Sequence, residues 1–289
     1  MTEKRKFYGM RNDYMFHAVL QKNEEVLRNL LATLLEMDET DIASCHIENP
    51  IELGKEIEGK ECILDVKLTL NNAKIINIEL QVYKQTYWVE RSLLYWARAF
   101  DSLKSGEDYS KLLPMYHIGI LDFTLFEEHP KFMGKYQLMD VEDQFLYSDK
   151  LCIKVLDLTQ LDAAKKQANI NKKLVKWASI FKAETLEELE QLANGEEVFE
   201  KMVVTMKKLS EDEKIRMQCE AREDYERCLL SEFNAGKREG EEIGEQRGRA
   251  MGEEIGEKRG KDETEKKLVQ HLMQSMKLSE TDAKKMLGL

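Results

Sequence analysis

The stretch Cys62–Tyr83, CILDVKLTLNNAKIINIELQVY, decides the fold of this chain. Apolar and polar residues alternate on both sides of the Asn71-Asn72 pair, and this period of two predicts two β-strands joined by a turn. If the hairpin turns about Asn72, Asp65 lies directly opposite Glu79 on the polar face. Two facing carboxylates repel each other, so this arrangement calls for a raised pKa, a nearby cation or a bound metal ion.

Composition limits the classes of function. With 289 residues and 42% apolar side chains, the chain can form one large or two ordinary domains. Its formal net charge of -11 argues against a general basic coat for nucleic acid, so any contact with DNA must be local or metal-assisted. The sequence contains neither an apolar leader nor a long apolar run, and its scattered cysteines include no CxxC pair. We therefore expect a cytoplasmic protein that binds no membrane and no zinc.

The segments around the hairpin predict a mixed sheet. A helix is expected over residues 11–37, with Asn12 as its N-cap. Asp13 follows in the first turn, where the helix dipole alone explains an acid, and it becomes an accessory site residue only if it reaches the hairpin. Further strands are predicted within residues 114–123, 136–141 and 151–158, and His117 in the first of them is interpreted as a core residue. The fold class is α/β with a mixed sheet.

Residues 86–105 have the spacing of a helix with two stripes. The apolar stripe consists of Val89, Leu93, Trp96, Ala97, Phe100 and Leu103. Beside it, Tyr87, Arg91, Tyr95 and Arg98 share a second face. Guanidinium groups suit phosphate oxygens and aromatic rings suit bases, so this face is the candidate nucleic-acid surface. A helix rim whose arginines pair with surface acids is the alternative interpretation.

The second half of the sequence is predicted to be helical, and part of it is an internal repeat. Seven glycines from Gly236 to Gly260 recur at every fourth residue between charged residues. Glycine destabilises a helix by about 1 kcal/mol relative to alanine. We therefore expect this segment either to be disordered or to pack on another helix, including one from a second copy of the chain. The expected regions are a sheet domain at 1–158, helices at 159–235, the glycine repeat at 236–263 and a helical end at 264–289.

Several of these motifs, taken in order, resemble a known family. They are Asn12-Asp13-Tyr14-Met15-Phe16, Leu64-Asp65-Val66, Ile78-Glu79-Leu80-Gln81, Glu90-Arg91-Ser92-Leu93-Leu94-Tyr95-Trp96 and Gly106-Glu107-Asp108-Tyr109. The ordered set covers roughly the first half of the chain and resembles the recombination-promoting nuclease and transposase family of the PD-(D/E)XK nuclease superfamily. This resemblance implies a restriction-endonuclease-like core, followed here by an all-α C-terminal region.

The resemblance also implies a metal-dependent DNA endonuclease. On the matching positions, Asp65 and Glu79 would bind a divalent ion, Mg²⁺ or Mn²⁺, which prefers oxygen ligands. The backbone carbonyl of Leu80 is the third implied ligand. DNA is the implied partner.

One position departs from the superfamily pattern, because Gln81 stands where that pattern has lysine. An amide donates hydrogen bonds but cannot neutralise developing negative charge. Lys67 or Lys84 would restore the positive charge if either reaches the site. The alternative interpretation is that both are solvated surface lysines. Two functions therefore remain open, an active nuclease and a catalytically silent relative that acts as a DNA-binding or self-associating module.

Overall fold

The computed structural model describes residues 6–51, 53 and 65–289. The chain forms two compact units, Met1–Glu226 and Arg227–Leu289. The first contains the sheet and most of the helices, and the second is helical. No helix within the described residues has both the length and the apolar character needed to cross a membrane.

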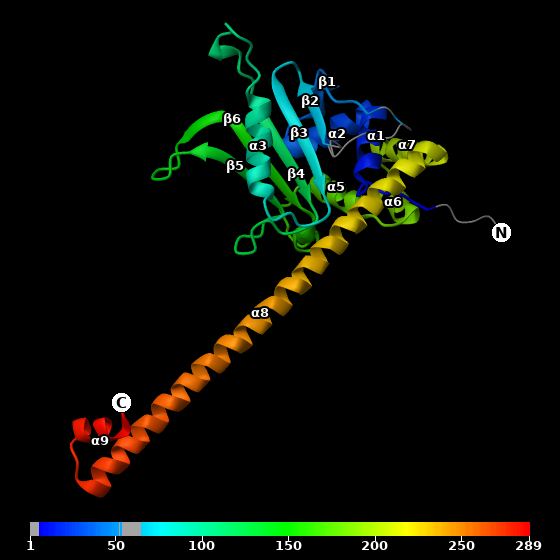
Figure 1. Cartoon of the computed structure of the whole chain (residues 1–289). Coiled ribbons are helices and arrows are strands. Elements are labelled where there is room, and N and C mark those ends of the chain that lie inside the picture. The colour runs from blue at the N-terminus through cyan, green and yellow to red at the C-terminus, as the bar shows by residue number, and fades with distance from the viewer. Residues whose placement is uncertain (1–5, 52, 54–64) are drawn as a thin grey trace, which may run out of the picture. The chain divides into compact units, whose positions relative to one another are not determined.

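A six-stranded mixed sheet forms the centre of the first unit (Figure 1). Its order is β1-β2-β3-β4-β6-β5, in which β3, β4 and β6 are parallel and the remaining neighbours are antiparallel. The strands are β1 (Cys45–Ile47), β2 (Val66–Leu70), β3 (Lys74–Gln81), β4 (Met115–Leu121), β5 (Met133–Met139) and β6 (Leu146–Asp157). The predicted α/β class with a mixed sheet is confirmed.

The β2–β3 hairpin turns about Asn72, as predicted. The register pairs Val66 with Ile78 and, next to the turn, Leu70 with Lys74. Asn71 and Asn72 have φ angles of 52° and 50°, a left-handed conformation that asparagine adopts more readily than most residues. The Asn71 side chain also fixes the turn, since its Nδ2 donates to the carbonyl of Asp41 at 2.7 Å.

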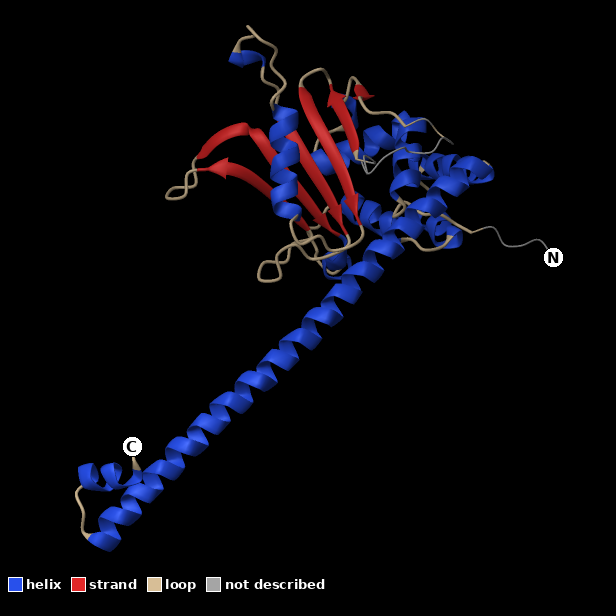
Figure 2. Ribbon diagram, viewed as in Figure 1, coloured by secondary structure: helices blue, strands red, loops and turns tan. Residues whose placement is uncertain are grey.

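Helices cover both faces of the sheet (Figure 2). The α3 helix (Trp88–Phe100) lies on one face, and α1 (Asp13–Lys22), α2 (Glu24–Leu35) and the later helices of the unit pack on the other. These later helices are α4 (Leu161–Ala164), α5 (Lys172–Lys182), α6 (Leu186–Ala193) and α7 (Glu197–Glu211), with short 3₁₀ helices at Glu39–Asp41, Tyr109–Lys111 and Leu158–Gln160. The main core lies between this helical layer and the sheet.

The single helix expected over residues 11–37 is two helices. Asn23 separates them with an extended backbone, at φ -135° and ψ 93°. The backbone N–H of Asn23 donates to the carbonyl of Val19 in the last turn of α1. Its side-chain oxygen accepts from the N–H of Val26 at the start of α2. An asparagine that caps a helix competes with continuation of the preceding one, which explains the break. Asn12 is the N-cap of α1, as predicted.

The glycine repeat lies within one long helix, α8 (Glu213–Met276), which is followed by α9 (Glu280–Leu287). In the second unit, Val269 of α8 and Ala283 of α9 are buried. Apart from the adjacent residues and the backbone of the helix itself, no described atom lies within 4 Å of a Cβ placed on any glycine from Gly236 to Gly260. The repeat is thus helical without another described helix packed on its glycines. Self-association through the repeat stays a prediction.

Candidate metal and catalytic site

The site is built on the face of the sheet that α3 covers. The β2–β3 register, continued by one residue beyond the pair Val66–Ile78, places Asp65 beside Glu79. The parallel β3–β4 register pairs Asn77 with His117 and Glu79 with Gly119. Partners in a ladder point to the same face of a sheet, so two acids, an amide and an imidazole from three strands come together there. Glu79, Asn77 and His117 are buried.

The two oxygens of the Glu79 carboxylate have different surroundings. Oε1 accepts a hydrogen bond from Gln81 Nε2 at 2.9 Å and lies 2.9 Å from Nη2 of Arg91. Oε2 lies 3.3 Å from Nε2 of His117, yet neither atom has a hydrogen-bond partner among the described residues. A buried carboxylate oxygen without a donor is energetically costly. Oε2 is therefore available to a ligand.

Asp65 is strongly perturbed. Burial raises the pKa of its carboxyl group to about 8, and the negative charge of Glu79 acts in the same direction. The guanidinium of Arg91 and a hydrogen bond with the Asn77 side chain lower this pKa. The repulsion that the hairpin register predicts between the two acids is thus present, and a positive charge at this position relieves it.

A closed ring of side chains connects β3 to the start of α3. The Gln81 amide donates to Glu79, and its Oε1 accepts from Nε2 of Gln85 at 2.9 Å. Gln85 Oε1 in turn accepts from Nη1 of Arg91 at 2.7 Å, and Nη2 of the same guanidinium reaches back to Glu79. Arg91 also stacks on the ring of Tyr95, with 5.1 Å between Cζ and the ring centroid. Both functional groups of Gln81 are therefore occupied.

The α3 helix is rotated relative to what its apolar stripe suggests. Leu93 and Ala97 of that stripe are exposed, whereas Arg91 and Tyr95 point towards the sheet and are only partly accessible. Tyr87 and Arg98 remain exposed. The structure thus divides the candidate nucleic-acid face, with two residues in the site and two at the surface.

Gly119 permits the close approach of α3. Trp88, the first residue of α3, packs its indole against the sheet where Gly119 pairs with Glu79. A Cβ added at Gly119 would lie 2.3 Å from Cζ2 of Trp88, and contacts this short do not occur. A side chain at this position would displace the helix that carries Arg91.

Gly119→Ala is accordingly expected to lower the free energy of unfolding by about 1–3 kcal/mol, the usual cost of overpacking a core. Denaturant unfolding followed by circular dichroism measures the change. Gly252→Ala on α8 is the matched control, since no described atom is near its Cβ position and alanine favours a helix. An unfolding midpoint for Gly119→Ala equal to that of the unaltered chain would contradict the packing argument.

The chain is similar to one family of known proteins. Residues 10–233, more than half of the chain, match the family described as PD-(D/E)XK nuclease family transposase. The chain belongs to this family. The searches of curated proteins and of solved structures found no match to the chain.

The structure brings together some of the site residues that the sequence predicts, but not the two candidate lysines. Asp65, Glu79 and Gln81 lie in the site described above. The predicted Lys67 shares their face, but its Nζ pairs with Glu48 at 2.9 Å. Lys84 pairs with Glu127 at 2.8 Å. Neither lysine contacts the two acids.

Asp13 lies near the pair and is engaged by another cation. Its carboxylate accepts from Nε of Arg222 on α8 at 3.0 Å and also forms an ion pair with that guanidinium. Its charge nevertheless contributes to the raised pKa of Asp65. Asp13 therefore acts on the site through its field, and a role as accessory acid stays a prediction.

The sequence alone did not identify His117, Asn77 and Gln85 as site residues. For His117 the reason is that a histidine in a buried strand is predicted to be part of the core. Its Nδ1 lies 3.3 Å from Nδ2 of Asn77, and its Nε2 lies 3.3 Å from Oε2 of Glu79. Only the parallel pairing of β3 with β4 brings it there.

The donor set fits the divalent metal that this nuclease family usually uses. It offers two acidic side chains, and one of them has an oxygen without a partner. Within the described part of the chain, no group of three or more acidic, histidine or cysteine side chains is arranged as a complete metal site. A metal bound here would therefore need further ligands from backbone, water or substrate, as Mg²⁺ commonly has.

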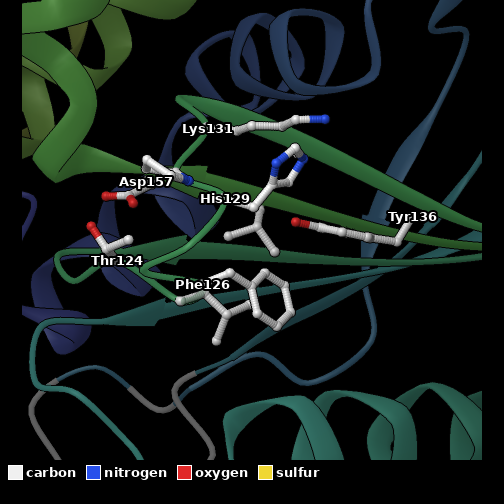
Figure 3. Close-up of a pocket in the computed structure, with 10 residues that line it drawn as sticks. Thr124, Phe126, His129, Lys131, Tyr136 and Asp157 are labelled. Atoms are coloured by element: carbon white, nitrogen blue, oxygen red, sulfur yellow. The ribbon is translucent and has the colours of Figure 1, made fainter.

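A separate pocket near the end of the sheet does not serve this site. Its lining includes Thr124, His129, Lys131, Tyr136 and Asp157, drawn in Figure 3, and neither Asp65 nor Glu79 contributes to it. Its volume is about 10 Å³, enough for a single water molecule and far too small for a nucleotide. The carboxylate pair under α3 remains the candidate site.

Proposed function

We propose that this PD-(D/E)XK family protein hydrolyses DNA phosphodiester bonds at the Asp65 and Glu79 pair with a bound divalent cation, Mg²⁺ or Mn²⁺. The observation that carries the proposal is the buried Oε2 atom of Glu79, which has no hydrogen-bond partner among the described residues and lies beside a second, partly buried acid. A divalent cation would both satisfy this oxygen and remove the repulsion between the carboxylates.

Asp65 and Glu79 would hold the cation, together with the backbone carbonyl of Leu80. When bound, such an ion polarises a phosphoryl oxygen and makes a coordinated water more nucleophilic. Gln81 and Arg91 fix the orientation of Glu79 through Oε1, which leaves Oε2 for the cation. In the net reaction the water oxygen bonds to phosphorus, one phosphorus–oxygen ester bond breaks, and a proton from the water ends on the departing sugar oxygen.

We further propose that DNA approaches along the exposed side of α3. Tyr87 offers a ring for stacking on a base, and Arg98 offers a guanidinium for a phosphate. This contact is local, in keeping with a net charge of -11, which disfavours binding through a broad basic surface. DNA affinity should therefore depend only weakly on salt, because few phosphates are neutralised.

The alternative is a catalytically silent relative that binds DNA or associates with itself. Two features favour it, namely Gln81 in the lysine position and an Arg91 guanidinium that already partly neutralises Glu79 without a metal. The two functions differ in one measurable property. An active nuclease must bind a divalent metal through its carboxylates, whereas a silent scaffold need not.

Plasmid nicking tests the proposal. Purified protein is expected to nick supercoiled DNA in Mg²⁺ or Mn²⁺, and EDTA in excess is expected to stop the reaction because the carboxylates alone cannot activate water. Isothermal titration calorimetry with Mn²⁺, in the absence of DNA, measures binding to the same chain. If the protein neither nicks DNA nor binds Mn²⁺, the nuclease assignment is contradicted and the silent scaffold is supported.

A further inference from the structure

The site lacks a positive charge at the lysine position of the PD-(D/E)XK pattern. Gln81 is neutral, and its amide is used at both ends, by Glu79 and by Gln85. It can orient neighbouring groups but cannot stabilise the negative charge that builds up on a phosphoryl group under attack. If the proposed hydrolysis takes place here, another residue has to supply that charge.

The lysines nearest to the motif in sequence do not supply it. Lys67 shares the sheet face with Asp65 but pairs with Glu48, at 2.9 Å. Lys84 is bound to Glu127 by an ion pair and a hydrogen bond at 2.8 Å. Moving either ammonium to the acids would require breaking an existing pair.

Arg91 is already in place. Its guanidinium lies 2.9 Å from Glu79, and it is the cation that lowers the pKa of Asp65, so its charge acts on both acids. Gln85 and the ring of Tyr95 hold the side chain, which is only 25% exposed. A charge fixed in advance stabilises a transition state without the cost of reorganising at the moment of reaction.

Arg91 also has an unused donor. Its Nη1 atom donates to Gln85 and Nη2 contacts Glu79, whereas Nε is buried and has no hydrogen-bond partner within the described residues. Phosphate oxygens are the acceptors for which a guanidinium is best suited. An orphaned Nε–H beside the acid pair is therefore a place where a substrate oxygen would be favourable.

We propose that Arg91 is a catalytic residue that supplies the positive charge to the scissile phosphate, in place of the lysine that Gln81 replaces. This role rests on the proposed nuclease function. The guanidinium donates a hydrogen bond to a non-bridging phosphate oxygen, and its charge offsets the negative charge that develops there as water adds. Gln81 and Gln85 are positioning residues that hold the guanidinium against Glu79.

A charge-relocation experiment on the full-length chain tests this assignment. Arg91→Gln is expected to lower the single-turnover cleavage rate at saturating DNA and Mg²⁺ by about 10²-fold, the usual effect of removing one preorganised donor. Arg91→Lys keeps the charge and is expected to stay within about tenfold of the unaltered protein. Adding Gln81→Lys to Arg91→Gln returns an ammonium to the site and is expected to recover about tenfold of the loss or more.

Metal affinity gives a second readout that does not depend on activity. Removing a cation beside Glu79 and Asp65 should tighten Mn²⁺ binding by about threefold or more, because the metal no longer competes with a like charge. A residue needed only to hold the fold would weaken both cleavage and Mn²⁺ binding when it is replaced. The matched control is Arg249→Gln, which removes an exposed arginine that pairs with Glu245 on α8.

The outcomes separate this inference from the proposed function. If the unaltered protein cleaves DNA and Arg91→Gln cleaves as fast, the role of Arg91 is wrong and the nuclease assignment stands. Loss of cleavage with weakened Mn²⁺ binding and no recovery by Gln81→Lys would make Arg91 a structural residue and also overturn the inference. An unaltered protein without metal-dependent cleavage overturns the proposed function, and this role with it.

Discussion

Glu79→Gln is expected to lower the rate of Mg²⁺-dependent DNA cleavage by about 10³-fold or more, a loss of several kcal/mol in transition-state stabilisation. Glutamine retains the shape of the side chain and an oxygen that can accept from Gln81 and Arg91. It removes the negative charge, and with its oxygen facing Gln81 and Arg91 it places an NH2 group, which does not bind a metal, where Oε2 was. Plasmid nicking over time at saturating Mg²⁺ measures the effect.

Folding must be separated from chemistry in this variant, since Glu79 is fully buried and its replacement leaves Arg91 without a full counter-charge. Thermal unfolding by circular dichroism provides that check, and Mn²⁺ calorimetry on the folded variant should show loss of binding. Glu142→Gln, at an exposed position between β5 and β6, is the matched control. A folded Glu79→Gln protein that nicks DNA at the unaltered rate would place the active site elsewhere.

Asp65→Asn is expected to have opposite effects on activity and stability. Cleavage should fall by about 10³-fold, because the second carboxylate is lost. The metal-free variant should nevertheless be more stable than the unaltered protein near pH 8, by about 1–3 kcal/mol. Asparagine removes the repulsion with Glu79 and can still accept a hydrogen bond from Asn77.

The pH dependence gives this prediction its sign. The folded-state pKa of Asp65 is raised from 3.8 to about 8, so between these values the folded chain holds a proton that the unfolded chain has lost. The contribution of Asp65 to stability is therefore complete below about pH 4 and is lost as the pH rises towards 8. The stability advantage of Asp65→Asn should grow over the same interval and level off above it.

Thermal unfolding in EDTA, at a series of pH values, measures this difference. The pKa of Glu226 is also raised, to about 7, mainly by burial, but it is common to both proteins and cancels in the comparison. Saturating Mg²⁺ should stabilise the unaltered protein and not the variant. Asp149→Asn, at an exposed position, should behave as the unaltered chain. A difference that does not change with pH would rule out the raised pKa as its cause.

The hairpin shows how much a local pattern determines. Alternating apolar residues and two central asparagines predicted both strands and the register that places Asp65 beside Glu79, and the Leu70–Lys74 pairing confirms that register. Period-two burial leaves little freedom, because a shift of one residue would turn every apolar side chain to the wrong face. The predicted mixed sheet and most of the later helices follow from similarly local signals.

The rotation of α3 shows where local pattern fails. Leu93 and Ala97 of the apolar stripe are exposed, although Trp96 of the same stripe donates to the carbonyl of Met115 on β4. The helix also turns Arg91 and Tyr95 inward. The sheet beneath the helix carries a buried carboxylate, which requires a cation, and Gly119, which leaves room for a large ring. The apolar periodicity depends on the sequence of the helix alone and carries no information about the side chains of the sheet below it.

The sequence by itself therefore determined the fold class, the hairpin register and the facing pair of acids, because each depends on the spacing of neighbours along the chain. Only the tertiary structure decided which groups surround that pair. Parallel pairing of β3 with β4 brings His117 to Glu79, and the orientation of α3 places Arg91 beside Glu79. Lys67 and Lys84, whose roles the sequence left open, pair with other acids. Contacts between separate elements depend on packing and on the balance of buried charge, and neither is encoded at any one position.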